Sequence, residues 1–300
     1  MKTLLLIDIN SIIHRCFHAI PLLTSPAGQP VNALYGLSST LLKIIREEKP
    51  DFIAAAFDRP EPTFREELYP EYKIQRPKVP GELAIQIKMS RKLLQKFKMK
   101  FFEKSGFEAD DILGSLANLF SKYKDLKIVI LTGDLDALQL VRGEKIVVRT
   151  PQKGLTEMNT YDRIKVKSRL GIFPEQIPDF KALVGDVSDN LPGIPGVGPK
   201  TAAILLNQFG DLDGIYKNFN KLDNIVSPKV CQSLKQLKSQ ALLVKKLASI
   251  RQDLKFDLKL DHLAYQIPRA DLINYFRKLG FNRLISRLEK FQGNQLNLDT

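Results

Sequence analysis

Short apolar runs alternate, along the first half of the chain, with longer segments whose apolar residues recur at helical spacing. A short apolar run that ends in a polar or acidic residue is typical of a buried strand. A segment such as NALYGLSSTLLKIIREE instead places its apolar residues on one face of a helix. The pattern predicts strands at TLLLID (3–8), DFIAAAF (51–57), KMKFF (98–102), KIVILT (127–132) and EKIVVRT (144–150), and helices at about 10–19, 32–48, 81–98 and 108–123.

This alternation of strands and helices predicts an α/β fold with a mostly parallel central sheet and helices on both faces. Ligands of such sheets bind outside the carboxyl ends of the strands. After about residue 160 the pattern becomes helical. We therefore expect an α/β domain at 1–170 with a Pro-rich, charged excursion at about 59–98, a helical region at 171–290, and a tail or linker at 291–300.

Acidic residues are crowded after the predicted strands and at the start of the helix that GFEADD opens. Acids at a helix start can cap N–H groups and offset the helix dipole, but this explains only one or two of the three in that segment. Like charges in one crevice raise each other's pKa values unless a cation neutralises them. Carboxylate oxygens suit Mg²⁺ or Mn²⁺, and two such ions lie about 3.5–4 Å apart in phosphoryl-transfer enzymes. The predicted ligands are Asp8, Asp58, Glu108, Asp110, Asp111, Asp134, Asp136, Asp186 and Asp189.

Zinc is not expected, because the chain has three His residues and none is predicted near the acids. The alternative for the acids is a set of unrelated cap and turn residues. Asp136 and Asp189 are the members that we expect to be structural or to lie outside direct contact with a metal.

The charge of the chain favours a polyanionic partner. The formal net charge is +13, and a strongly basic protein often binds nucleic acid, although a solvated Lys surface would give the same charge. The basic residues gather in the excursion and in the last third of the chain, away from the acids. No apolar run is long enough to span a membrane, and Cys16 and Cys231 have no disulfide or zinc spacing, so we expect a cytoplasmic protein without a membrane partner.

The segment GIPGVGPKTA (193–202) has the pattern of a phosphate-binding turn that leads into a helix. Gly196 and Gly198 permit close approach of a phosphate, Pro199 begins the helix, and Lys200 and Thr201 add a positive charge and a hydroxyl. The segment resembles the helix–hairpin–helix of sequence-independent DNA binders. A plain helical hairpin with a Gly turn is the alternative. Contacts of this kind position a duplex without reading its sequence.

The excursion carries FREELYPEYKIQRP (64–77). Lys73 and Arg76 are placed to stabilise charge on a reacting phosphate, and Tyr69 or Tyr72 to stack on a base of a single strand. A solvated surface loop is the alternative.

Together these segments resemble the 5′-nuclease domain of bacterial DNA polymerase I, in the flap endonuclease superfamily. The resemblance covers most of residues 3–290 and is looser toward the C-terminal end. It is carried by LLLIDINSIIHRCFHA, NALYGLSSTLLK, AAFDRPEPTFREELYPEYKIQRP, GFEADDILGSLA, ILTGDLDALQL and LVGDVSDNLPGIPGVGPKTA.

The resemblance implies a structure-selective 5′→3′ exonuclease and flap endonuclease that cuts 5′-flap or nicked duplex DNA and leaves a 5′-phosphate and a 3′-hydroxyl. RNA–DNA primer junctions are further expected substrates. It implies that the nine acids hold metal and that the excursion forms an arch for the 5′ strand. Catalytic roles fall to Asp8, Asp110, Lys73 and Arg76, and DNA contacts to Arg15, Tyr35, Tyr72, Lys73, Arg76, Gly196, Gly198, Lys200 and Thr201.

The resemblance also implies a K⁺ ion at the turn, a DNA polymerase activity in cis or in trans, a role in replication and repair, and a monomer. Two residues depart from the family pattern: Ile9 stands where a Gly is usual, and Leu135 where a Lys is common. The sequence leaves two alternatives, a non-catalytic DNA-binding module and an RNA-cutting nuclease with a related sheet.

Overall fold

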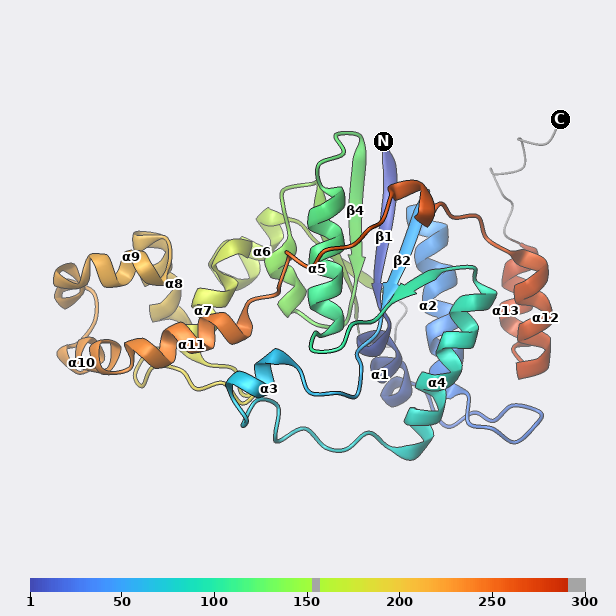
Figure 1. Ribbon diagram of the computed structural model, residues 1–300, viewed down its shortest axis with the longest axis horizontal. Helices are drawn as coiled ribbons and strands as arrows, with labels where there is room; N and C mark the ends of the chain where they lie inside the picture. Colours follow the sequence, from blue (N-terminus) through green and yellow to red (C-terminus); the bar gives the residue numbers. More distant parts are fainter. Residues whose placement is uncertain (153–156, 291–300) are drawn as a thin grey trace.

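A six-stranded sheet forms the centre of the computed structural model, which describes residues 1–152 and 157–290 (Figure 1). Five strands are parallel, and the last pairs antiparallel with its neighbour. The predicted mostly parallel sheet is therefore confirmed. Across the sheet the strands lie in the order β3-β2-β1-β4-β5-β6. In chain order they are β1 (Lys2–Asp8), β2 (Phe52–Ala56), β3 (Lys100–Phe102), β4 (Leu126–Leu131), β5 (Ile146–Pro151) and β6 (Met158–Tyr161).

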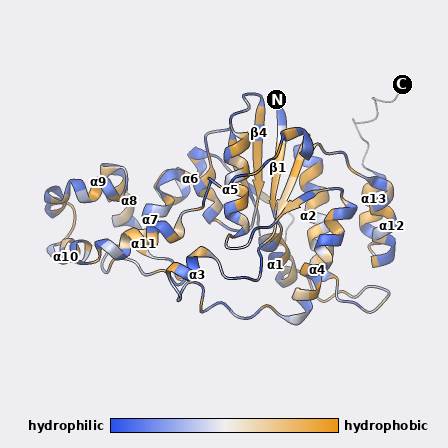
Figure 2. Ribbon diagram, in the orientation of Figure 1, coloured by the Kyte–Doolittle hydropathy of each residue, from blue (hydrophilic) through white to orange (hydrophobic). Residues whose placement is uncertain are grey.

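Helices cover both faces of this sheet, because successive side chains of each strand point to opposite sides. Leu4 and Leu6 of β1 lie in one core with α5, whereas Leu5 and Ile7 lie in a second core on the other face. Figure 2 shows apolar residues concentrated on the strands and on the inner sides of these helices. The second face is covered by α1 (Ile9–Ala19), α2 (Asn32–Glu48), α4 (Gly81–Lys96), α12 (Arg269–Leu279) and α13 (Asn282–Glu289), and the first by α5 (Ala109–Phe120).

The helical region extends to one side of the sheet (Figure 1). Its core is continuous with that of the α5 face, since buried residues of α7 and α8 belong to the same cluster as Leu4 and Ile112. The predicted C-terminal helical subdomain is thus confirmed. Its helices are α6 (Arg163–Leu170), α7 (Ile177–Val184), α8 (Pro199–Phe209), α9 (Leu212–Lys217), α10 (Pro228–Gln236) and α11 (Lys238–Ala248).

Residues 249–265, here called the return segment, bring the chain back across α5 to the sheet (Figure 1). The segment lies flat on α5 because Gly114 has no side chain: a Cβ there would be 2.8 Å from the carbonyl oxygen of Arg251. At its end Tyr265 N–H donates to the Asp51 carbonyl at 2.8 Å. The range predicted as one helical region, 171–290, therefore divides, because α12 and α13 pack on the sheet.

The excursion contains an element that its sequence did not predict. Thr63 and Glu66 form a capping box that begins α3 (Phe64–Leu68), a stabilising arrangement even for a short helix. The chain then follows an irregular path to α4, which begins at the predicted residue (Figure 1). Within the described residues no helix is both long and apolar enough to cross a membrane. The predicted tail at 291–300 lies outside the described residues.

Candidate metal centre

Five predicted metal ligands line one cavity of about 280 Å³ at the carboxyl ends of the central strands. The strand order reverses between β1 and β4, which is where a sheet of this kind leaves a crevice. Asp8 ends β1, Asp58 follows β2, and Asp134 follows β4, whereas the remaining two stand at the start of α5. We call Asp8, Asp58, Glu108, Asp110 and Asp134 the first acid group.

Backbone and hydroxyl donors hold two of these carboxylates, Asp8 and Asp58, in place. Asp8 accepts from Ser11 N–H at 3.0 Å, which caps α1, and from the Thr132 hydroxyl at 2.9 Å. Asp58 accepts from Ala109 N–H at 2.7 Å, so the carboxylate after β2 is tied to the first residue of α5. These contacts orient the oxygens toward the same crevice.

Asp110 lies at the centre of the group and lacks such a donor. Its Oδ1 atom is buried and has no hydrogen-bond partner within residues 1–152 and 157–290. Burial raises the pKa of Asp110 well above its ordinary value, and the neighbouring charges of Asp8, Asp134 and Asp58 raise it further. A buried, unpartnered oxygen among carboxylates fits a cation, because a divalent ion would satisfy the oxygen and neutralise the repulsion.

Burial and like charge also act on the neighbours of Asp110. Burial raises the pKa of Asp8 to about 7, and Asp58 adds to the shift, whereas bonds from Ser11 and Thr132 oppose it. Burial likewise raises the pKa of Asp58. The first acid group therefore favours either protons or a bound cation.

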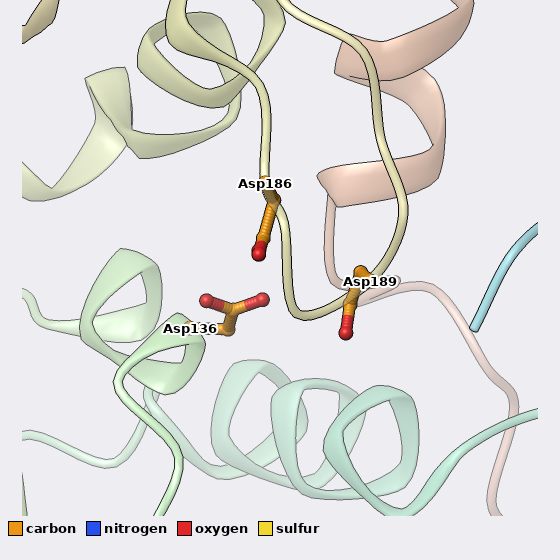
Figure 3. A group of neighbouring side chains, drawn as sticks. All are labelled: Asp136, Asp186 and Asp189. Atoms are coloured by element: carbon orange, nitrogen blue, oxygen red, sulfur yellow. The ribbon is translucent and has the colours of Figure 1, made fainter. Parts of the chain in front are cut away.

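Three further acids form a separate cluster beside the first. Oxygens of Asp136, Asp186 and Asp189 lie within 4.8 Å of one another, with Asp136 on η1 (Asp136–Leu140) and the other two on the loop after α7 (Figure 3). We call them the second acid group. Asp136 N–H donates to Asp134 at 2.9 Å, which links the two groups.

Lys181 neutralises part of the second acid group. Its Nζ donates to both Asp136 Oδ2 and Asp186 Oδ2. Burial alone would raise the pKa of Asp186, but bonds from Lys181 and Ser188 outweigh it and lower the value. At Asp136 burial prevails over Lys181 and raises the pKa to about 6.

The excursion brings two basic residues to the acids, and their contact with a phosphate stays a prediction. Lys73 Nζ donates to Glu108 at 2.7 Å and Arg76 to Asp189 at 2.8 Å. Lys73 has a φ of 55°, a left-handed conformation that is uncommon for a residue with a side chain, and its N–H donates to the Asp189 carbonyl at 3.0 Å. The backbone is thus held so that both cations face the cavity.

Tyr72 differs from its prediction as a base-stacking residue. It is 4% exposed, and its hydroxyl donates to Asp189 at 3.1 Å. Because the ring is buried in the core, its aromatic face cannot reach a base. Tyr69 is partly buried and donates to Glu71 at 2.9 Å, and its stacking stays a prediction.

The prediction that Asp111 is a metal ligand is wrong. Both of its oxygens receive the guanidinium of Arg65, at 2.7 and 2.8 Å, and the carboxylate is fully buried. The N–H groups of Glu108 and Arg251 donate to it as well, at 3.1 and 2.9 Å. Successive helical residues point about 100° apart, so Asp110 faces the cavity and Asp111 faces the junction of α3, α5 and the return segment.

Other residues at the site were missed from the sequence. His14 lines the cavity, so the expectation of no His near the acids was wrong. Asn10 accepts from Asp58 N–H at 3.2 Å. Since α1 begins directly after Asp8, one helical turn brings residues 10, 11 and 14 to the cavity, a signal that was present in the strand–helix boundary.

The two departures from the family pattern leave the acids in place. Ile9 is buried and begins α1 while Asp8 caps that helix. Leu135 is 38% exposed, so it adds apolar surface, and no charge, beside the acids.

The predicted DNA-contact residues fall into two places. Gly196 has a φ of 85°, which favours glycine, and Gly198 is the N-cap of α8, whose first residues include exposed Lys200 and partly buried Thr201. The predicted turn and helix are therefore present.

Arg15 and Tyr35 lie on the α1–α2 side. The Arg15 side chain lies beside Gly133. Tyr35 packs edge-to-face on Phe281 with ring centroids 5.2 Å apart. Their contact with DNA stays a prediction.

Comparisons with known proteins agree over nearly the whole chain. Residues 3–171 match the family model described as "5'-3' exonuclease, N-terminal resolvase-like domain", and residues 172–271 match "5'-3' exonuclease, C-terminal SAM fold". DNA polymerase I of Bacillus caldotenax is 39% identical over 289 residues, 96% of this chain, but the match spans only 32% of that relative. A 5′-3′ exonuclease of Aquifex aeolicus is 37% identical over 93% of this chain and 91% of its own length.

Solved nucleases share the fold at low sequence identity. The T5 5′-exonuclease with bound zinc has a TM-score of 0.66 and 19% identity, covering 96% of this chain and 97% of that one. The catalytic core of Rad2 in complex with a DNA substrate has a TM-score of 0.61 and 16% identity, covering 96% of this chain and 92% of its own.

Proposed function

Because the chain belongs to the 5′-3′ exonuclease family, we propose that it hydrolyses phosphodiester bonds of 5′-flap or nicked duplex DNA with the help of divalent metal ions. The observation that carries the proposal is the buried Oδ1 of Asp110, unpartnered within the described chain and surrounded by four other carboxylates of the same cavity. A chain that only bound DNA would have no reason to keep so destabilising a cluster.

The first and second acid groups would hold the ions, with Mg²⁺ or Mn²⁺ as the cations that carboxylate oxygens prefer. When bound, such ions stabilise charge on a phosphate and make a nearby water molecule a better nucleophile. Asp111 takes no part in holding them, because Arg65 occupies both of its oxygens.

Lys73 and Arg76 bind the phosphate at the bond to be cut. Both are already fixed beside the cavity by their own backbone and by Glu108 and Asp189. If Glu108 and Asp189 held a divalent ion, the ammonium of Lys73 and the guanidinium of Arg76 would be free to bond to a phosphate oxygen. Their charges then stabilise the negative charge that develops there.

The turn at residues 193–198 and the start of α8 hold the duplex through its phosphates. Exposed Lys200 supplies the charge, and a K⁺ ion at the turn belongs to the same proposal. Arg15 and Tyr35 contact the strand near the acids. RNA–DNA primer junctions are further substrates, and a DNA polymerase activity acts with this one in cis or in trans, in a cytoplasmic protein that works as a monomer.

The test is cleavage of an end-labelled 5′-flap duplex with Mg²⁺ and with EDTA, for the unchanged chain, Asp110→Asn and the control Asp253→Asn. Asp253 pairs with Arg251 on the surface, so its variant should cut normally. We expect cutting that needs Mg²⁺ and that falls by more than about 100-fold in Asp110→Asn, since altering even an outer-shell partner of a metal can cause losses of about 10–100-fold. Tight binding without cutting by the unchanged chain would instead identify a non-catalytic DNA-binding module.

A further inference from the structure

Lys181 occupies the place in the second acid group where a cation would be expected. It stands near the end of α7, and Gly185, with a φ of 79°, then turns the chain so that Asp186 lies beside the helix that precedes it. A side chain at Gly185 would clash, because a Cβ would be 2.7 Å from Gly193 N. The fold therefore fixes Lys181 and Asp186 as neighbours.

The lysine takes carboxylate oxygens that a metal would need. Its Nζ bonds to one oxygen of Asp136 and one of Asp186. The other oxygen of Asp186 accepts from the N–H and the hydroxyl of Ser188, at 2.8 and 2.6 Å. Both oxygens of Asp186 thus already accept hydrogen bonds. The lone pair that is left on Oδ2 lies beside the Lys181 ammonium, so a metal ion that binds there must overcome that charge or displace the lysine.

Lys181 is the partner that can leave more easily. Its ammonium is joined to α7 by a flexible four-carbon chain that moves without the backbone, whereas the Ser188 N–H belongs to the loop itself. A divalent ion and an ammonium group also repel each other at this distance. The side chain is 14% exposed, so a path toward solvent exists.

We propose that Lys181 is a built-in cation that competes with the divalent metal for the second acid group. It holds the carboxylates together when metal is absent, and it lowers the affinity of the group for metal because the ion must overcome its charge or displace it. This inference rests on the proposed function in taking the second acid group as a metal site.

The test is Mn²⁺ binding to the full chain, followed by electron paramagnetic resonance and calorimetry, for the unchanged protein, Lys181→Met and Lys181→Gln. Both variants remove the charge, and Gln keeps a hydrogen-bond donor in case the Met variant does not fold. We expect the Mn²⁺ affinity of the second acid group, which Lys181 makes the weaker of the two sites, to rise about tenfold or more in either variant. The reason is that one opposing charge is removed at close range. Equal or weaker affinity would overturn the proposal.

A second readout follows the fold. Without metal, Lys181→Met should melt at a lower temperature than the unchanged chain, and saturating Mn²⁺ should restore more of its stability than it adds to the unchanged chain. In the unchanged chain, the NMR signal of the Lys181 Cε–H₂ group should shift on adding Mg²⁺ as the ammonium leaves. A signal that stays at its metal-free position at saturation would contradict displacement.

Lys245→Met is the matched control. Lys245 Nζ pairs with buried Asp179 at 2.7 Å, also against α7, but neither residue belongs to an acid group. This variant should bind Mn²⁺ as the unchanged chain does. If the unchanged chain neither binds divalent ions nor cuts a flap, the proposed function fails. If it does both and the Lys181 variants bind no tighter, only the role of Lys181 fails.

Discussion

The two acid groups lie side by side, yet basic side chains compensate their charges to different degrees, and in the first group Lys73 bonds to Glu108. In the first, burial and mutual repulsion raise the pKa values of Asp8, Asp58 and Asp110, and one oxygen of Asp110 has no partner among the described residues. In the second, Lys181 and Arg76 bond directly to the carboxylates. A carboxylate cluster can therefore depend largely on an external cation, or it can contain most of the compensating charge itself.

Asp111 is a third case, because Arg65 bonds to both of its oxygens and compensates its charge fully. Its substitution gives the largest expected change in stability. Asp111→Ala leaves the 2%-exposed Arg65 without its main carboxylate, and we expect a loss of about 3–5 kcal/mol in the free energy of unfolding, as when one partner of a buried ion pair is removed. Urea unfolding in EDTA measures it.

The control for this prediction is Asp253→Ala, which removes a surface pair with Arg251 and should lose less than about 1 kcal/mol. If Asp111→Ala lost no more than this control, Glu108, whose Oε2 is 3.5 Å from Arg65, would be shown to compensate the guanidinium by itself.

A pair of substitutions should separate the two groups by the sign of the effect. At pH 8 in EDTA, Asp110→Asn removes a carboxyl group whose ionisation burial and its neighbours oppose and supplies an amide donor to those neighbours, so we expect stability to rise by about 1 kcal/mol. Asp186→Asn instead removes a carboxylate that Lys181 needs, and stability should fall by about 1–3 kcal/mol. Melting curves under the same conditions give both values, and equal signs would erase the distinction between the groups.

The pH dependence of the metal-free protein should report the first group. The folded pKa of Asp8 is about 7 against an ordinary value of 3.8, so between these values the folded state keeps a proton that the unfolded state releases. Stability should therefore fall as pH rises from about 4 to 7, by at most about 1.4 kcal/mol per pH unit for each such group. The pKa of Asp186 is lowered, so this carboxylate stabilises the folded state at any pH above its ordinary pKa. That contribution is lost only as the pH falls through the lowered folded-state pKa.

Melting temperatures in EDTA across this range test that dependence, with excess Mg²⁺ as the comparison. Bound metal favours the ionised carboxylates, so the decline should shrink when Mg²⁺ is present. A melting temperature that rises from pH 4 to 7 in EDTA would contradict the raised pKa values.

The smallest effect is expected outside both groups. Lys200→Ala removes one proposed phosphate contact at the start of α8, so duplex affinity should fall about twofold to tenfold and the salt slope of binding should decrease by about one. Filter binding at several salt concentrations measures this. Lys2→Ala, at the amino end of β1 and exposed, is the control, and equal slopes for the two variants would remove the turn from the DNA contacts.

The sequence predicted what local pattern determines. Apolar runs marked β1, β2 and β4, and the acids after them converged because parallel strands end at one edge. The strand β6 was not predicted, because MNTY is short and polar and pairs only at the edge of the sheet. Its neighbour β5 had been predicted from a clear apolar run.

Pairings between distant residues could not be predicted. Arg65 and Asp111 are 46 residues apart, and nothing local distinguishes Asp111 from Asp110 beside it. No local pattern connects Lys181 with the acids, and only the turn at Gly185 brings Asp186 back beside it. Tyr72 looked like an exposed aromatic residue of a loop until the loop was seen to dock on the acids.

The return segment has a mechanical consequence. The helical region leaves the sheet after β6 and comes back at Asp51, where Phe52 and Ala264 form a β-bridge, so it is a lobe with two attachments and no free end. A lobe hinged at one point could swing widely, but a second attachment resists that rotation. A duplex bound at α8, as proposed, would therefore keep a nearly constant distance and direction relative to the acids.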